Sequence, residues 1–223
     1  MCFSASASFI AAAALAASGV ATLCLASRRS ELPFAAVPLL FGIQQFIEGL
    51  IWLSFDNDLS VPNSNLTFGY SIFSHVLWPI YVPFAVHLLE RVHWRRQALL
   101  ATQAVGMLVG LYLLYVLTQY PVTSRVLGQH IVYESPHFYQ VPVMALYLIA
   151  TCASSMLSSH RLIRLFGMLT LGTFLAAYAI HAATLVSVWC FFAAILSSIV
   201  YVFFRRARSR NGLPSSSPSG LKA

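Results

Sequence analysis

Charged residues are what this sequence most lacks. Of its 223 residues only 9% are Asp, Glu, Lys or Arg, whereas a soluble domain carries about 25%. Hydrophobic residues make up 59% of the chain, and the mean hydropathy is +0.77. So few charges cannot cover a water-exposed surface. The composition therefore argues against an ordinary soluble domain and predicts an integral membrane protein.

Cysteines and catalytic motifs are also scarce. The four cysteines, at positions 2, 24, 152 and 190, contain no CxxC pair, which argues against a disulfide scaffold. No HExxH motif is present, and no basic residues precede the first apolar run, so we expect no cleaved signal peptide. The net charge of +7 follows the bias of membrane proteins towards basic loops, and we expect no nucleic-acid partner.

Long apolar runs dominate the rest of the chain. They predict an all-α bundle of seven transmembrane helices over residues 8–27, 33–55, 68–89, 98–118, 138–158, 163–181 and 185–204. The last two helices share the run 163–204, which exceeds a single crossing of about 20 residues, so we predict a turn within 181–187. The predicted membrane domain is 1–204. The tail 205–223 is basic and then rich in Ser, Pro and Gly, which predicts disorder.

Three features of these runs refine the expected packing. The first span is rich in Ala, Ser and Gly, which predicts a helix packed closely inside the bundle. Pro79 and Pro83 interrupt the third span, so the carbonyls of His75 and Pro79 lose their helical partners. The longest connection, 119–137, is expected to be a loop.

Basic residues set the expected orientation. Lys and Arg fall at 28–29, 91–96, 161–164 and from 205 onward, which are alternate connections of the seven-span arrangement. The other connections hold only Arg125. By the positive-inside rule the N-terminus is outside and the C-terminus cytoplasmic. We expect a multi-pass protein of the inner (plasma) membrane, with the lipid bilayer as its first partner.

Glu48 is the only acidic residue within an apolar segment. Inserting a carboxylate at the centre of a membrane helix costs about 2.5–3.5 kcal/mol, so such residues tend to be functional. Glu48 lies about 22 Å along its span, at 1.5 Å per residue, and shares a helix face with Gln44. The orientation places both, with Gln45 and Trp189, in the extracytoplasmic third. Five further polar residues map to the same depth in the membrane. They are the histidines His75, His137 and His181 and the cysteines Cys2 and Cys190.

Three interpretations of this cluster remain open. The first is a site for zinc or another transition metal, with Glu48, His75 and His181 as the main candidate ligands and Cys2, His137 and Cys190 as further candidates. Such a metal could activate water to hydrolyse a lipid-like substrate. The second is a proton-coupled transporter. The third is a non-catalytic subunit or sensor, in which the polar residues only join helices. The residues do not decide whether the protein is an enzyme.

Several short segments carry a resemblance to a known group. They are Met1-Cys2-Phe3-Ser4, the stretch 38–45 (Pro-Leu-Leu-Phe-Gly-Ile-Gln-Gln), Glu48-Gly49, Trp52 and Trp189-Cys190. Together they resemble an uncharacterised family of bacterial seven-helix membrane proteins that begin Met-Cys-Phe-Ser, over residues 1–204. The resemblance implies a topology and no activity. The layout is also similar to alkaline ceramidases and adiponectin receptors, but Trp189-Cys190 stands where those zinc proteins have paired histidines.

Overall fold

The protein is a helical bundle with one β-hairpin. The computed structural model describes residues 4–55, 61–128, 130–135, 138, 140–181 and 185–211, except for the side chains of 180, 181, 210 and 211. Within these residues six helices are long and apolar enough to cross a membrane: Ala5–Leu25, Arg29–Phe55, Asn63–Leu89, His93–Gln119, Arg161–Ala179 and Leu185–Ser209. A shorter apolar helix, Val141–Met156, stands where the fifth span is predicted. The chain is therefore that of a multi-pass membrane protein.

Several spans are built from more than one helical segment. The N-terminal segments are α1 (Ala5–Leu25), the 3-10 turn η1 (Arg29–Glu31), α2 (Leu32–Ala35) and α3 (Val37–Phe55). The middle segments are α4 (Asn63–Ser71), the π-helical η2 (Ile72–Leu77), α5 (Trp78–Leu89) and α6 (His93–Gln119). The last are α7 (Val141–Leu148), the π-helical η3 (Ile149–Ala153), α8 (Ser154–Met156), α9 (Arg161–His181), α10 (Leu185–Leu196) and α11 (Ser198–Asn211).

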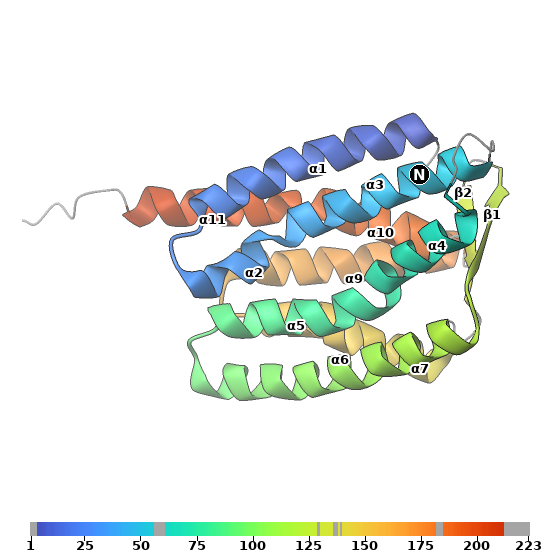
Figure 1. Cartoon of the computed structure of the whole chain (residues 1–223). Helices are drawn as coiled ribbons and strands as arrows, with labels where there is room; N and C mark the ends of the chain where they lie inside the picture. Colours follow the sequence, from blue (N-terminus) through green and yellow to red (C-terminus); the bar gives the residue numbers. More distant parts are fainter. Residues whose placement is uncertain are drawn as a thin grey trace, which may run out of the picture.

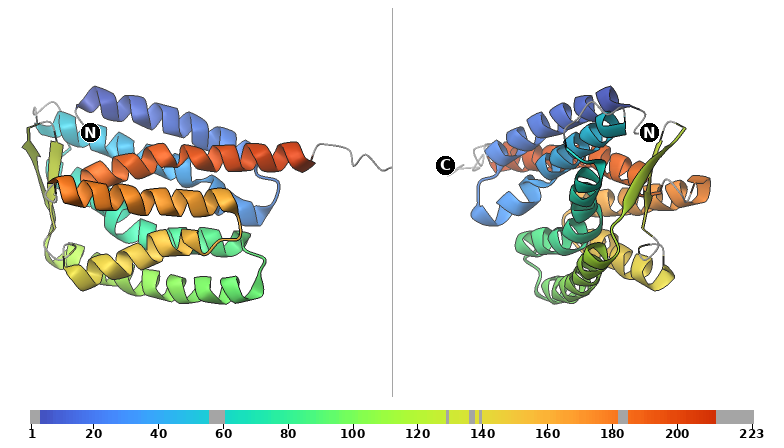
Figure 2. Two further views of the ribbon diagram at one scale, coloured as in Figure 1. Left: turned by 180° about the vertical axis from the view of Figure 1, so that it is seen from behind. Right: turned by 45° about the vertical axis from the view of Figure 1, so that its right-hand side comes forward.

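The two ends of the bundle differ. One end, the hairpin end, carries the start of α1 and the β-hairpin (Figure 1). The other, the basic end, carries the connections after α1, α5 and α8 and the end of α11 (Figure 2). The basic runs 28–29, 91–96 and 161–164 all lie at the basic end, as the sequence pattern predicts.

Helix α1 packs closely on α3 but lies at the edge of the bundle (Figure 1). A Cβ atom added at Gly19 would lie 2.5 Å from the backbone nitrogen of Leu39, so the two helices touch through backbone there. The opposite face is open, with Ile10 71% and Val20 54% exposed. The prediction of an interior helix is wrong, because the small residues that permit close approach form one face only.

The prolines of the third span coincide with a close approach of α6. A Cβ added at Gly106 would lie 1.9 Å from the Pro79 carbonyl oxygen. The side-chain amide of Gln103 also donates to the Ile80 carbonyl at 3.2 Å. Helix α6 therefore packs directly on the backbone that the prolines interrupt, as expected for irregular backbone inside a membrane domain.

The connection 119–137 is not a plain loop. Strand β1 (Thr123–Leu127) pairs antiparallel with β2 (His130–Glu134), and Gly128 lies in the turn with φ of 61°. Residues 131–133, Ile-Val-Tyr, favour strand and are buried, so β2 forms where its side chains can cover the helix ends. The Tyr133 ring stacks on Tyr70 of α4, with centroids 4.4 Å apart. This hairpin corrects the predicted loop, while the other elements of the described chain are helices, as the predicted all-α class requires.

The basic tail is helical at its start. Helix α11 continues through Arg205 to Asn211, so the predicted disorder from residue 205 is wrong for this stretch. Arginines at the last turns of a helix interact favourably with the helix dipole. The Arg208 guanidinium also donates to the Cys24 carbonyl at the end of α1, at 3.3 Å. Residues 212–223 lie outside the described residues.

Candidate functional site

Glu48 is the centre of a buried hydrogen-bond network. Its side chain and those of Gln44 and Gln45 have no exposed surface. The Gln45 side-chain amide donates to one Glu48 oxygen at 3.1 Å, and the Ser187 hydroxyl of α10 donates to the other at 2.9 Å. Two uncharged donors from two helices therefore fix the carboxylate and satisfy part of its hydrogen-bonding capacity.

The network extends to α4 and α5. The Trp78 indole N–H donates to the Gln44 side-chain oxygen at 2.8 Å. The Cys190 thiol lies against Gln44 and Tyr70, and the Glu48 carboxylate is near enough to act on it electrostatically. The structure thus brings together four residues of the sequence-predicted cluster, namely Gln44, Gln45, Glu48 and Cys190.

Two polar atoms of this network lack hydrogen bonds. Gln44 Nε2 and Gln45 Oε1 are buried, and neither has a hydrogen-bond partner among the described residues. A buried polar atom left unsatisfied costs about 1–3 kcal/mol, and nearly all such atoms in folded proteins find a partner, often a water or a ligand. The network therefore has capacity for a further polar group.

Sequence reasoning missed Ser187, Tyr70 and Trp78. A serine, a tyrosine or a tryptophan within an apolar helix has no distinctive pattern, and Ser187 is 139 residues from its partner. Trp78 gave a weak signal in the sequence. A buried indole N–H usually donates to an acceptor, and the side-chain oxygens of Gln44 and Gln45 are candidate acceptors inside the bundle.

His75 belongs to a separate polar group. Its Nδ1 atom lies 2.7 Å from the Ser74 hydroxyl, and its Nε2 atom lies 3.1 Å from the Ser135 hydroxyl, just after β2. The ring packs on Phe138, with centroids 4.6 Å apart. Both ring nitrogens are therefore occupied, and no hydrogen bond joins His75 to Glu48 within the described part of the chain.

The predicted metal ligands are only partly in view. Across the described residues no group of three or more His, Cys, Asp or Glu side chains could hold a metal ion. Cys2, His137 and the side chain of His181 lie outside the described residues. Glu48 and Cys190 are the two predicted ligands that belong to one polar network. The metal site stays a prediction.

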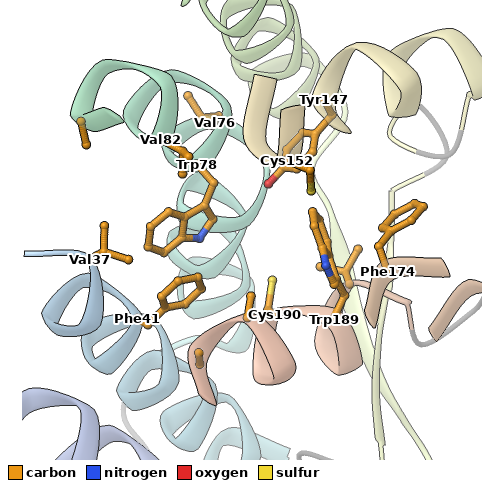
Figure 3. Packing of buried hydrophobic residues seen from close by; sticks show 14 of the residues in the cluster. Val37, Phe41, Val76, Trp78, Val82, Tyr147, Cys152, Phe174, Trp189 and Cys190 are labelled. Atoms are coloured by element: carbon orange, nitrogen blue, oxygen red, sulfur yellow. The ribbon is translucent and has the colours of Figure 1, made fainter. Parts of the chain in front are cut away.

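A narrow apolar cavity, the aromatic slot, borders the network. Figure 3 shows Phe41 and Trp78 on one side, Tyr147 and Trp189 on the other, and Cys190 between them. Phe41 stacks on Trp78 with centroids 3.9 Å apart, and Tyr147 meets Trp189 edge-on at 5.7 Å. The cavity volume is about 30 Å³, room for about two waters.

Trp189, predicted as a member of the polar cluster, lies beside Cys190 in the wall of the slot. Its indole N–H donates to the Thr170 carbonyl of α9 at 2.9 Å, so the polar edge of the ring is bound to another helix and its apolar body forms the slot wall. Cys190 is the residue shared by both features: it lines the slot and lies against Gln44 of the network. The slot and the Glu48 network are therefore contiguous.

Comparison with known proteins gives a family and no activity. No curated protein and no solved structure matches the chain. A family model described as a family of unknown function, DUF6629, matches residues 1–215. This match agrees with the uncharacterised family that the sequence resembles. Since it spans almost the whole chain, the protein belongs to the DUF6629 family.

Proposed function

We propose that this membrane protein binds a lipid-like ligand, with the apolar part of the ligand in the aromatic slot and its polar end at the Glu48 network. One observation carries the proposal: an apolar cavity and a buried network with unpaired amide atoms meet at Cys190. Binding sites are commonly apolar hollows with a few convergent polar groups. Here the polar groups are Gln44, Gln45 and Glu48.

The size of the slot limits the ligand class. A cavity of about 30 Å³ is far below the roughly 300–1,000 Å³ of a site for a drug-sized molecule. It admits a slender group such as the end of an alkyl chain. A flexible amphiphile fits this description, and the bilayer supplies such molecules directly.

The proposal includes the finer topology. We propose seven crossings, with Val141–Met156 as a short fifth crossing, and an inner membrane location with the N-terminus outside. At 1.5 Å per residue this helix is about 24 Å long, somewhat less than the roughly 30 Å hydrocarbon core. The concentration of arginines at the basic end supports this orientation. The Glu48 network then faces the extracytoplasmic half of the bilayer.

Photolabelling tests the slot. The full-length protein, reconstituted in vesicles, is irradiated with a long-chain alcohol that carries a diazirine near its chain end and whose hydroxyl can donate to Glu48. Adducts are mapped by mass spectrometry. We expect labels on the slot walls. Ala193 lines the slot, so Ala193→Leu should remove these labels. Ala101 is exposed on α6, so Ala101→Leu is the matched control and should leave them unchanged. Equal labelling of the two variants would refute binding of the alkyl chain in the slot.

Glu48→Gln tests the polar end in the same assay. A hydrogen bond to a charged group contributes about 1.5–3 kcal/mol, so we expect about tenfold weaker labelling or more. Unchanged labelling would mean that Glu48 does not contact the ligand.

A metal is the second candidate, because two predicted ligands, Glu48 and Cys190, belong to one polar network in which Gln44 lies against Cys190. Elemental analysis of the purified protein and of the variants Glu48→Gln and Cys190→Ser tests it. Stoichiometric zinc or another transition metal, lost in both variants, would support the metal and with it hydrolysis of a lipid-like substrate. A wild-type protein without metal would exclude it.

A further inference from the structure

A large cavity, here called the basic pocket, opens at the basic end of the bundle. Its volume is about 750 Å³, within the range of sites for small molecules. It lies among the connection before α2, the end of α5, the start of α9 and the end of α11. Four arginines from these four segments line it: Arg28, Arg91, Arg161 and Arg206.

The carboxylates near this pocket are bound to other groups. Glu31 lines the pocket, but its Oε2 atom accepts the backbone N–H groups of Ser27 and Arg28, at 2.8 and 3.1 Å. Within the described residues the only salt bridge joins Arg125 to Glu134 at the hairpin end. Among the residues that the structure describes, no ion pair therefore compensates the positive charge of the four pocket arginines.

Glu90 holds two walls of the pocket together. Its carboxylate accepts the backbone N–H groups of Arg91, Val92 and Ser159 at 3.0, 2.9 and 2.7 Å, and the Ser159 hydroxyl at 2.9 Å. Burial raises the pKa of Glu90, but these hydrogen bonds and the charge of His160 lower it by more. The pKa is therefore below its usual value, and Glu90 is an anion that already has its partners.

The chemistry of the pocket suits a phosphate group with an apolar neighbour. Guanidinium groups bind phosphate oxygens through paired N–H donors. The start of α9, at Arg161 and Leu162, adds the positive end of a helix dipole. Leu89, Phe203 and Phe204 supply apolar wall. Basic pockets between membrane helices commonly bind anionic lipid headgroups.

We propose that the basic pocket binds a phosphate-bearing ligand, with Arg28, Arg91, Arg161 and Arg206 contacting the phosphate oxygens. The ligand is either the headgroup of an anionic phospholipid or a free phosphate compound. The apolar wall favours the phospholipid, whose glycerol and upper chains would contact it. None of the residues that line this pocket belongs to the Glu48 network, so the two sites are independent.

Two matched double variants test the proposal in the full-length protein. Arg28→Gln with Arg206→Gln removes two pocket charges. Arg29→Gln with Arg205→Gln removes the neighbouring exposed charges, which do not line the pocket. The measurements are native mass spectrometry with phosphatidylglycerol or phosphatidylcholine, and calorimetry with inorganic pyrophosphate. All five proteins, namely the wild type, the two double variants and the single variants Arg91→Gln and Arg161→Gln, are first compared by size-exclusion elution.

We expect the wild type to retain phosphatidylglycerol and not phosphatidylcholine. Each pocket arginine lost should weaken binding about tenfold or more, and the control pair should change it less than twofold. If the double variant of Arg28 and Arg206 fails to fold, the single variants Arg91→Gln and Arg161→Gln test the same loss of phosphatidylglycerol binding. If pyrophosphate binds and displaces phosphatidylglycerol, the arginines contact the phosphate group of the lipid. If pyrophosphate binds and phosphatidylglycerol does not, the ligand is a soluble phosphate compound. Equal losses in the two pairs, or no binding of either probe, would overturn the proposal.

Discussion

Replacing Glu90 with glutamine should destabilise the protein strongly. The substitution keeps the shape of the side chain, and one oxygen can still accept from Arg91, Val92 and the Ser159 hydroxyl. The other oxygen becomes an NH₂ group. It then faces the Ser159 backbone N–H, which lies 2.7 Å from the present oxygen. Two donors would point at each other in a buried place.

The magnitude follows from these four contacts. Three hydrogen bonds change from charged to neutral acceptors, from about 1.5–3 to about 0.5–1.5 kcal/mol each. The fourth is lost, at about 1–3 kcal/mol for the unsatisfied donor. Water at the end of the bundle offsets part of this sum. We therefore expect a loss of about 2–5 kcal/mol in the free energy of unfolding.

Unfolding in mixed detergent micelles, followed by circular dichroism, measures the effect against pH. The folded-state pKa of Glu90 is below its usual 4.5, so the carboxylate stabilises the fold above pH 4.5. This stabilisation disappears as the pH falls through the lower, folded-state pKa. The wild type should therefore keep its advantage over Glu90→Gln above pH 4.5 and lose it progressively as the pH falls below that value.

A carboxylate in an exposed pair provides the control. Glu134 pairs with Arg125 at 2.6 Å, but the side chains are 49% and 59% exposed. Exposed ion pairs contribute little to stability, so Glu134→Gln should leave the unfolding free energy nearly unchanged. If the two variants were equally stable at neutral pH, the account of Glu90 as the link between two connections would be refuted.

Two further experiments test the packing and the Glu48 network. Gly106→Ala would put a methyl group 1.9 Å from the Pro79 carbonyl oxygen and should lower the free energy of unfolding by about 1–3 kcal/mol or more. Gly69→Ala is the control, because no atom lies within 4 Å of the added methyl group, and it should be neutral or stabilising. Equal effects of the two variants on the unfolding midpoint would contradict the close approach. Ser187→Ala combined with Glu48→Gln in a double-mutant cycle should give a coupling of about 0.5–1.5 kcal/mol. A coupling near zero would show that the hydroxyl does not donate to the carboxylate.

The hairpin shows how a connection can be misjudged from sequence. Residues 131–133, Ile-Val-Tyr, and the glycine at 128 are ordinary strand and turn signals. The strand forms because Ile131 and Tyr133 have helix ends to cover, with exposures of 0% and 2%. That surface exists only once the bundle is assembled.

The sequence likewise predicted only part of the candidate site. Glu48 stood out because a charge in an apolar run is costly wherever the helix packs. His75 was predicted at the same depth, and depth follows from span boundaries and 1.5 Å per residue. Yet the ring contacts Ser74 and Ser135, because helix rotation and lateral position decide which residues at one depth meet.

The sequence by itself determined the membrane environment, the apolar segments, the basic end and the unusual carboxylate, because each depends on the local cost of placing polar atoms in hydrocarbon. Only the tertiary structure decided that Ser187 donates to Glu48 from 139 residues away, and that Cys190 joins the network to the aromatic slot. It also decided that four arginines from separate segments line one pocket. These relations depend on how helices pack side by side, and hydropathy along a chain carries no information about that.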